Sequence, residues 1–421
     1  MSEQIPEGWT QEKLSNFCNG IRGVSYKPDD LHRLPSEETV TLLRSNNIQD
    51  SGLLLDDIQL VDNSKVKPNQ IARPKDIAVC MSNGSRRLVG KSSSFRDIPD
   101  RGSYTVGAFC SIFRPLESAN PDFVVQLFKS NQYLQQVDLS LAGSAINNLK
   151  NSDLEEYEFL CPPKSEQQKI ASILTSVDEV IEKTESLISK LQDLKKGMMQ
   201  ELLTKGIGHT EFKDSPVGRI PKQWDAGLVN DVIESYAYGP RFNAKNYDPN
   251  GNVKTIRGTD VSSDGAIKYK QVPIALLDGS IVNKHALQDK DIVMITTADC
   301  GVTAVFQSQQ IPYICSAYAI RLRPNNKLNP FYFNFFMQTD NALKQVDKYV
   351  RKGTVANLPG SDVLKIKFPL PSVEEQEQIV SILSSIDERI SKKLLRFNKY
   401  KHLKSALMQD LLTGKVRVKT D

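Results

Sequence analysis

The sequence predicts an α+β protein of two pseudo-symmetric halves, each a mixed, β-rich domain followed by one long α-helix. Three observations support this prediction: a helical stretch that occurs twice, apolar residues at heptad spacing through both copies, and short β-type runs before each copy. Because each helix presents an apolar stripe, the two helices are expected to pair as an antiparallel coiled coil.

The repeat is measured by a constant offset. Residues 162–181 read PPKSEQQKIASILTSVDEVI, and residues 371–390 read PSVEEQEQIVSILSSIDERI, so that Ile379 follows Ile170 by 209 positions. Over the aligned helical stretch close to half the residue pairs are identical. Solenoid units recur every ~20–50 residues, so this repeat indicates a duplicated domain. The expected segments are the domains 1–161 and 208–370, the helical regions 162–207 and 371–415, and a basic tail, 416–421.

Each domain carries short runs rich in β-branched residues and separated by turn residues, of which KDIAV (75–79) and KDIVM (290–294) match between the halves. After these runs each half has an Asn-Pro pair that predicts a helix start. Asn120 and Asn329 are expected to cap these helices, with proline at the first helical position. Strands followed by a helix favour an α+β arrangement over a regular βαβ repeat.

The long helices are expected to begin after Pro163 and Pro371, with Ser165 or Ser372 as caps, and to end near Gly206 and Gly414. With Ile170 at heptad position a, apolar residues continue at positions a, d and e, which suits a helix buried against more than one partner. The residues predicted to form the helix–helix or partner interface are Ile170, Ile173, Val177, Ile181, Leu187, Leu191, Leu194, Met198, Ile379, Ile382, Ile386, Ile390, Leu403 and Leu407.

Composition limits the classes of function. The chain has 421 residues, 39% of them hydrophobic, and its 54 basic residues exceed its 50 acidic residues by only four, so net charge alone does not identify a partner. The six cysteines and four histidines share no metal-ligand spacing, which favours reduced thiols and no zinc site. No apolar run reaches the length of a membrane span, and we expect a cytoplasmic protein with no membrane contact.

Three segments approach catalytic motifs without matching them. Gly84–Ser92 resembles a phosphate-binding loop but has five residues between its glycines where that motif has four. The Asn-Pro-Phe-Tyr stretch at 329–332 resembles an aminomethyltransferase motif but lacks its second proline. Glu211-Phe212-Lys213 matches only the tail of a nuclease pattern, without converging acids. We therefore expect no catalytic residues and no metal site.

Polar and basic residues gather in three matching loops of each half, where the two halves differ most. Arginine, asparagine and aspartate can read base edges, while lysine, serine and threonine commonly contact phosphates. The sequence therefore predicts two DNA-reading surfaces. The predicted contacts are Arg22, Tyr26, Lys27, Arg44, Asn46, Asn83, Ser85, Arg86, Arg87 and Lys91 in the first half, and Arg241, Asn243, Lys245, Arg257, Thr259, Asp260, Thr296, Thr297 and Asp299 in the second.

The repeated helical stretch and the segment LLTKGIGHTEFKDSPVGRIPKQW (202–224) resemble the conserved regions of the specificity subunit of type I restriction-modification enzymes. The resemblance spans essentially the whole chain. It implies that the two β-rich domains are target recognition domains, that the helices are spacers, and that each domain reads one half of an asymmetric, split site in double-stranded DNA.

The resemblance further implies a non-catalytic subunit that binds no cofactor. Two methyltransferase subunits that use S-adenosylmethionine would dock on it, and restriction subunits that use ATP and magnesium would complete the endonuclease. A DNA-recognition subunit of a type IIB system is an alternative. Two less similar alternatives are a self-contained DNA enzyme and a scaffold whose helices only bring proteins together.

Overall fold

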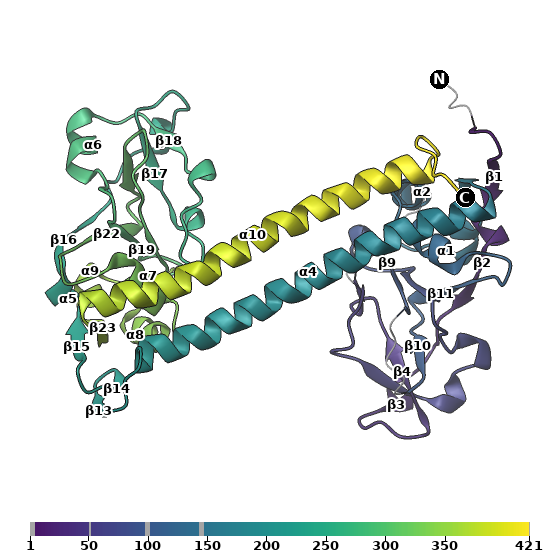
Figure 1. Ribbon diagram of the computed structural model, residues 1–421, viewed down its shortest axis with the longest axis horizontal. Helices are drawn as coiled ribbons and strands as arrows, with labels where there is room; N and C mark the ends of the chain where they lie inside the picture. The colour runs from purple at the N-terminus through teal and green to yellow at the C-terminus, as the bar shows by residue number, and fades with distance from the viewer. Residues whose placement is uncertain (1–4, 50–51, 97–101, 143–146, 421) are drawn as a thin grey trace. The chain divides into compact units, whose positions relative to one another are not determined.

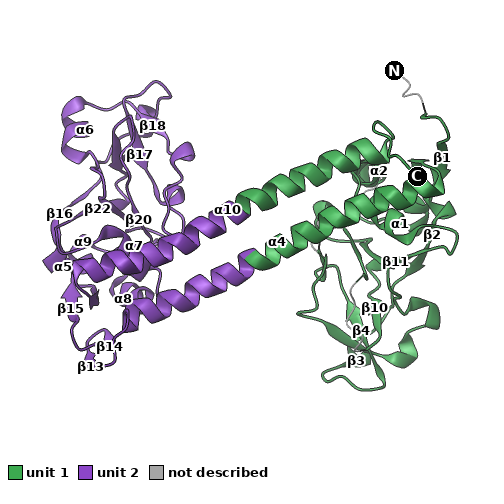
Figure 2. Cartoon of the chain, in the orientation of Figure 1, with its two compact units in different colours: residues 1–187, 394–421 green, residues 188–393 purple. Residues whose placement is uncertain are grey.

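The computed structural model describes residues 5–49, 52–96, 102–142 and 147–420, which form two compact units (Figures 1 and 2). Unit 1 comprises residues 1–187 and 394–421, and unit 2 comprises residues 188–393. Each unit therefore contains one β-rich domain together with part of helix α4 (Lys164–Lys205) and part of helix α10 (Val373–Leu412). The predicted α+β fold with two repeated halves is confirmed. No helix in these ranges is both long and apolar enough for a membrane crossing.

Unit 1 is built around an antiparallel sheet of order β2-β11-β8-β9 and a second sheet of order β10-β4-β7-β3, in which β10 runs parallel to β4. Strands β1 and β12 form a separate antiparallel pair, as do β5 and β6. The strands are β1 (Thr10–Lys13), β2 (Cys18–Arg22), β3 (Leu31–His32), β4 (Thr39–Leu43), β5 (Ile48–Gln49), β6 (Gly52–Leu53), β7 (Gln59–Asp62), β8 (Ile77–Cys80), β9 (Ser92–Ser94), β10 (Tyr104–Val106), β11 (Cys110–Pro115) and β12 (Glu158–Cys161). The short helices are α1 (Pro121–Leu127), α2 (Asn131–Ala142) and α3 (Asn151–Glu155).

Unit 2 repeats this plan with the sheets β16-β22-β19-β20 and β18-β17-β21, the latter with β17 parallel to β21. Its pair β15-β23 corresponds to β1-β12, and β13-β14 is a hairpin. The strands are β13 (Phe212–Ser215), β14 (Gly218–Pro221), β15 (Asp225–Leu228), β16 (Ile233–Tyr238), β17 (Val253–Ile256), β18 (Ile274–Ala275), β19 (Ile292–Ile295), β20 (Thr303–Val305), β21 (Tyr313–Cys315), β22 (Ala319–Pro324) and β23 (Lys367–Leu370). The helices are α5 (Val229–Val232), α6 (Gly279–His285), α7 (Pro330–Met337), α8 (Asp340–Tyr349) and α9 (Gly360–Val363).

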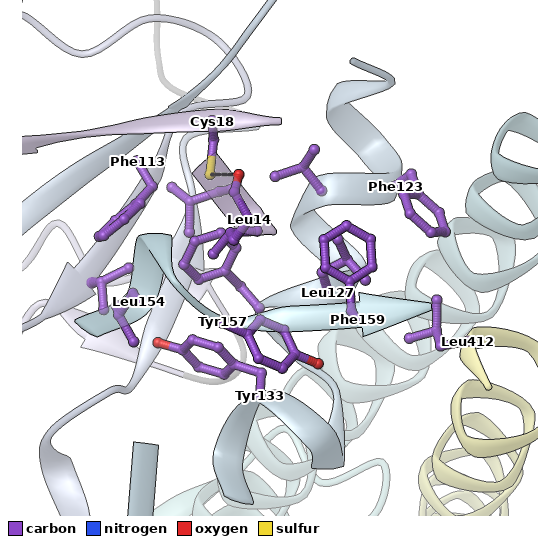
Figure 3. Close-up of a cluster of buried hydrophobic side chains, with 14 of the residues drawn as sticks. Leu14, Cys18, Phe113, Phe123, Leu127, Tyr133, Leu154, Tyr157, Phe159 and Leu412 are labelled. Carbon is purple, nitrogen blue, oxygen red and sulfur yellow. Dashed lines mark hydrogen bonds between the residues drawn. The ribbon is translucent and has the colours of Figure 1, made fainter. Parts of the chain in front are cut away.

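The central strand of each unit is buried on both faces, which explains its continuous apolar sequence. In β8, Ile77 and Val79 join the core under the helices, which Figure 3 shows in part, whereas Ala78 and Cys80 face the second sheet. Strand β19 divides in the same way between two cores. Because successive side chains of a strand point to opposite faces, each central sheet packs against a helical layer on one side and a second sheet on the other.

An ion pair stabilises the turn before each central strand. Arg114 of β11 donates from Nε and Nη2 to Asp76 (2.7 Å for Nη2), and Arg323 of β22 donates to Asp291 in the same way (2.8 Å). Both carboxylates are almost fully buried. The Lys-Asp segments (75–76 and 290–291) and the Arg-Pro segments (114–115 and 323–324) thus form the same contact in both units, and this contact keeps a buried carboxylate paired.

Helix starts follow the predicted caps with one exception. The side chains of Asn120 and Asn329 accept hydrogen bonds from the amides of the first helical turn in α1 and α7. Ser372 caps α10 by accepting from the amide of Glu375 (3.3 Å). The prediction for Ser165 was wrong, because α4 already begins at Lys164 and Ser165 lies inside its first turn.

In unit 1 the first part of α4 packs against the last part of α10, and their directions are opposite. Ile170 and Leu174 share a buried cluster with Met408 and Leu411. Asp178 forms an ion pair with Lys404 (2.5 Å). Pairing of an early residue of α4 with a late residue of α10 is the antiparallel arrangement predicted from the sequence.

In unit 2 the last part of α4 packs against the first part of α10. Leu203 shares a buried cluster with Ile379 and Leu383. Lys195 pairs with Asp387 at 2.7 Å. Pairing of a late residue of α4 with an early residue of α10 is again an antiparallel arrangement.

The first turn of each long helix carries a glutamate that binds the segment following the other helix. Glu375 accepts from the indole Nε1 of Trp224 (2.8 Å) and from the amide of Ile207 (3.0 Å), and its Oε1 lies 2.9 Å from His209 Nε2. At the equivalent position in unit 1, Glu166 is paired with Arg417. The hydrogen bond from Arg417 lowers the pKa of the Glu166 carboxyl.

The buried seam of α4 comprises only part of the stripe at positions a, d and e predicted from the sequence. Leu174 and Ile188, both at position e, are buried, whereas Leu187 and Leu194 at position d are 44% and 50% exposed. Leu403 of α10 is similarly exposed. An a/e seam arises because each helix also packs on a β-rich domain, which shifts its apolar face. Leu187, Leu194 and Leu403 are thus only partly covered within this chain, and their role in a helix–helix or partner interface stays a prediction.

Candidate nucleic-acid interface

In unit 1, three loops meet at one tight turn, residues 107–110, between β10 and β11. The amide of Gly107 donates to the carbonyl of Leu43 (2.9 Å), and carbonyls of the turn accept from the amides of Gly23 (3.0 Å) and Met81 (2.9 Å). A Cβ at Gly23 would lie 2.1 Å from a turn carbonyl, so this close approach requires glycine. The turn thus holds the start of the three polar loops that follow β2, β4 and β8.

Unit 2 contains the same frame at residues 316–319, between β21 and β22. The amide of Ser316 donates to the carbonyl of Ile256 (2.8 Å), and turn carbonyls accept from the amides of Gly239 (3.3 Å) and Thr296 (3.0 Å). A Cβ at Gly239 would lie 1.8 Å from the carbonyl oxygen of Cys315 and 2.4 Å from that of Ser316 in the turn. Both frames gather the loops whose residues were predicted to contact DNA.

Several predicted residues of unit 1 carry exposed side chains. Arg22, Lys27 and Arg87 are exposed, and within the described ranges no hydrogen bond or ion pair involves their side chains. The side chain of Arg86 is also exposed and donates to a carbonyl of α2, that of Asp138 (3.0 Å). These cations are available to phosphates at the ends of β2 and β8.

Other predicted residues of unit 1 hold the loops in place. Asp57 accepts hydrogen bonds from Arg44 Nη2 (2.8 Å) and Asn46 Nδ2 (2.9 Å). Three further contacts join one loop to another: Asn83 with Ser45, Lys91 with Gln49, and Tyr26 with Gln59. The amide of Ser85 donates to Asn83 Oδ1. These side chains are pre-oriented, which reduces the entropy lost when a ligand binds.

In unit 2 the predicted residues divide into exposed and buried groups. Asp260 has no exposed surface and forms an ion pair with Arg257 (3.0 Å), while the buried hydroxyl of Thr296 donates to the carbonyl of Tyr318 (3.0 Å). Asp260 and Thr296 are therefore part of the fold in this structure. The remaining positions are exposed or half-buried: Arg241, Asn243, Lys245, Thr259, Thr297 and Asp299. DNA contact by the individual residues stays a prediction.

Sequence reasoning missed the residue at the tip of each turn. Phe109 is 69% exposed and Tyr318 is 61% exposed, although large aromatic side chains are usually covered. The two positions differ by 209, the offset of the helical repeat. Comparison of GAFC (107–110) with SAYA (316–319) at that offset could have identified them.

The segments that approached catalytic motifs have structural explanations. Glu211 lies at the surface beside β13, paired with Lys222 (3.2 Å). The segment 84–92 contains a short 3-10 helix and the first residue of an edge strand, and no α-helix begins there. In the described part of the chain, no group of three or more His, Cys, Asp or Glu side chains is arranged to hold a metal ion.

Comparison with known proteins shows which protein family this chain matches. A family model described as type I restriction modification DNA specificity domain matches residues 6–193 and 221–396, one match per half. The specificity subunit of the type I restriction enzyme EcoKI of Escherichia coli is 25% identical, over 94% of this chain and 87% of that protein. The StySPI specificity subunit of Salmonella potsdam is 27% identical over the same shares.

Solved structures agree on the fold. The crystal structure of the S subunit of a type I restriction-modification system from M. genitalium superposes with a TM-score of 0.57 at 16% identity, covering 98% of this chain and 97% of that one. A chain from a structure described as the basis of complex assembly and conformational transition of a type I system gives a TM-score of 0.56 at the same identity, over 98% of this chain and 100% of that one.

Proposed function

Because the chain belongs to the family of type I restriction-modification DNA specificity domains, we propose that it is the DNA-reading subunit of such a system. Each β-rich domain reads one half of a split, asymmetric site in double-stranded DNA. The observation that carries this proposal is the shared frame of backbone hydrogen bonds, which gathers three loops of different content in each unit. Two readers of unlike sequences need a common framework with variable loops.

The catalytic steps belong to other subunits in this proposal. Two methyltransferase subunits bind S-adenosylmethionine and modify adenine, and restriction subunits that use ATP and magnesium cut the DNA. The loops gathered here contribute side chains that bind phosphates and base edges, without an arrangement suited to transferring a methyl group. The specificity subunit thus selects the site and leaves the chemistry to its partners.

Exposed apolar residues on the long helices suit docking of the methyltransferase subunits. In unit 1, Val180 and Leu187 of α4 are exposed, as are Leu395 and Leu403 of α10. Apolar side chains exposed on an otherwise charged helix favour contact with another protein surface. The antiparallel helices then serve as a spacer between the two readers.

The deciding experiment exchanges one reading domain. The full chain is co-expressed with its methyltransferase subunits, and methylated adenines are mapped across the host genome. Replacement of residues 20–105 by the equivalent segment of another specificity subunit should change one half of the methylated sequence and leave the other half intact. A matched exchange of residues 236–320 should change the opposite half.

Three results would contradict the proposal. A methylated sequence unaltered by both exchanges would indicate a scaffold. An exchange that altered both half-sites at once would contradict independent readers. Methylation or cleavage of DNA by the purified chain alone, supplied with cofactors, would indicate a self-contained enzyme.

A further inference from the structure

Phe109 and Tyr318 are solvent-exposed aromatic residues at equivalent positions of the two units. The neighbouring positions hold small side chains: Ala108 on one side of Phe109, and Ala317 and Ala319 on the two sides of Tyr318. These rings are consequently more than half exposed although an exposed aromatic ring contributes little to folding. An exposed aromatic ring that does not stabilise the fold, yet occurs at equivalent positions of both units, indicates a surface that binds a ligand.

The backbone under each ring is held firmly. The carbonyl of Phe109 accepts from the amides of Met81 (2.9 Å) and Ser82 (3.1 Å), and that of Tyr318 accepts from the amide and the hydroxyl of Thr296. The flanking Cys110 and Ala319 are fully buried. Each ring therefore stands on a rigid support, so that little conformational entropy is lost when it makes a contact.

The surroundings of the rings identify the chemistry of that ligand. Three loops start beside each ring, and those of unit 1 carry the exposed cations Arg22, Arg86 and Arg87. An aromatic ring among cations is suited to nucleic acid, whose phosphates bind the cations and whose bases stack on or are wedged apart by the ring. A protein partner would be expected to meet a broader apolar patch at this position.

We propose that Phe109 and Tyr318 are base-contacting residues, one for each half-site, whose rings pack against a base while the surrounding loops hold the phosphates and read base edges. This inference rests on the proposed DNA-reading function and adds two residues to it. Because the ring is uncharged, its contribution is independent of salt, unlike that of the arginines around it.

The test uses the complete complex of the chain with its methyltransferase subunits and a duplex carrying the methylated sequence found by genome mapping. Affinity is measured by fluorescence anisotropy between about 50 and about 200 mM salt. Phe109→Ala should weaken binding about tenfold, the value expected for loss of one base–aromatic contact. The slope of log K against log salt should stay unchanged, whereas Arg87→Ala should reduce that slope by about one.

Conservative variants and matched controls separate a base contact from a general surface effect. Phe109→Tyr and Tyr318→Phe should retain binding, since each installs the ring found in the other unit. Leu34 is exposed beyond the opposite end of β4 from Leu43, and Leu276 lies beyond the opposite end of β17 from Ile256. Leu34→Ala and Leu276→Ala should leave binding unaltered.

The possible outcomes are distinguishable. Wild-type affinity in both Phe109→Ala and Tyr318→Ala would overturn the inference while leaving the proposed function intact. Loss of assembly with the methyltransferase subunits, at unchanged affinity per assembled complex, would assign the rings to a protein contact and would also overturn it. Absence of site-specific binding by the wild-type complex would refute the proposed function itself.

Discussion

Removal of one buried charge between the long helices tests how unit 1 holds its helix pair. Asp178 of α4 is 10% exposed, receives a hydrogen bond from Gln126 (3.0 Å), and lies 2.5 Å from Lys404 and 4.0 Å from Lys129. Burial raises the pKa of the Asp178 carboxyl, but the two lysines and Gln126 more than compensate, so that the pKa is lowered overall. Asp178→Asn keeps the shape and removes the charge.

The expected cost follows from the groups left behind. In the variant, Lys404 is only 15% exposed and faces Lys129, with Glu182 as the remaining nearby carboxylate. Breaking a buried ion pair costs about 3–5 kcal/mol. Because asparagine can still accept the hydrogen bond from Gln126 and both lysines retain some contact with water, we expect about 2 kcal/mol, equivalent to about 30-fold faster opening.

The measurement is amide hydrogen exchange of the full chain, read on the buried strands β8 and β11, with the strands of unit 2 as an internal reference. Glu179→Gln, a neutralisation at the adjacent exposed position, is the matched control and should not change exchange. Asp387→Asn, at the equivalent site of unit 2, should cost less than about 1 kcal/mol because Asp387 is 40% exposed.

A double-mutant cycle decides whether the ion pair is the cause. Lys404→Met alone leaves Asp178 near Lys129 and should cost about 1 kcal/mol. The double variant removes both charges of the Asp178–Lys404 pair and should be more stable than additivity predicts by about 1 kcal/mol. Strict additivity, or an Asp178→Asn effect no larger than that of Glu179→Gln, would refute this reasoning.

Two further predictions concern the helices. Leu187→Asp should leave the chain folded, since Leu187 is exposed, but should weaken capture of the methyltransferase subunits at least tenfold in a pull-down titration; the matched Leu174→Asp, at a buried position, should unfold unit 1. Asp178 and Glu166 have lowered pKa values in the folded chain, so their stabilisation is present above the unfolded pKa and is lost as pH falls through the folded pKa. Urea denaturation should therefore show unit 1 weakening below about pH 4, and less steeply in Asp178→Asn; a pH dependence unchanged by Asp178→Asn would contradict this assignment.

The fold was predictable because the sequence patterns that indicate its elements are local and occur in both halves. Proline, asparagine caps and glycine stops marked the helices to within a few residues, and the Ile77–Cys80 run marked a strand buried on both faces. The apolar stripe of α4 at positions a, d and e was predicted, but not which of its residues are buried: Leu174 is covered because it also packs on the β-rich domain, whereas Leu187 is exposed. Tertiary context decided which apolar residues were covered.

The loops predicted to form the candidate site do gather in each unit, whereas which of their side chains are exposed was only partly predictable; DNA contact itself stays a prediction. The loops were recognised by their polar content, yet burial of Asp260 depends on its pairing with Arg257 inside a short 3-10 turn, which residue type does not reveal. Phe109 was overlooked because an isolated aromatic residue usually signals core. Only the neighbouring small residues and the repeat offset distinguish it from a buried ring.

The frame explains how two halves can diverge in their loops and keep one fold. Its hydrogen bonds join backbone amides to backbone carbonyls, at Leu43, Gly107 and Phe109 in unit 1 and at the equivalent positions of unit 2. Such bonds do not depend on side-chain identity, so the loop residues are free to change. The frame requires only a few particular residues. These are a glycine where the strands approach closely and the buried Asp–Arg ion pair. The loop residues can therefore change while the backbone hydrogen bonds that stabilise the fold are kept.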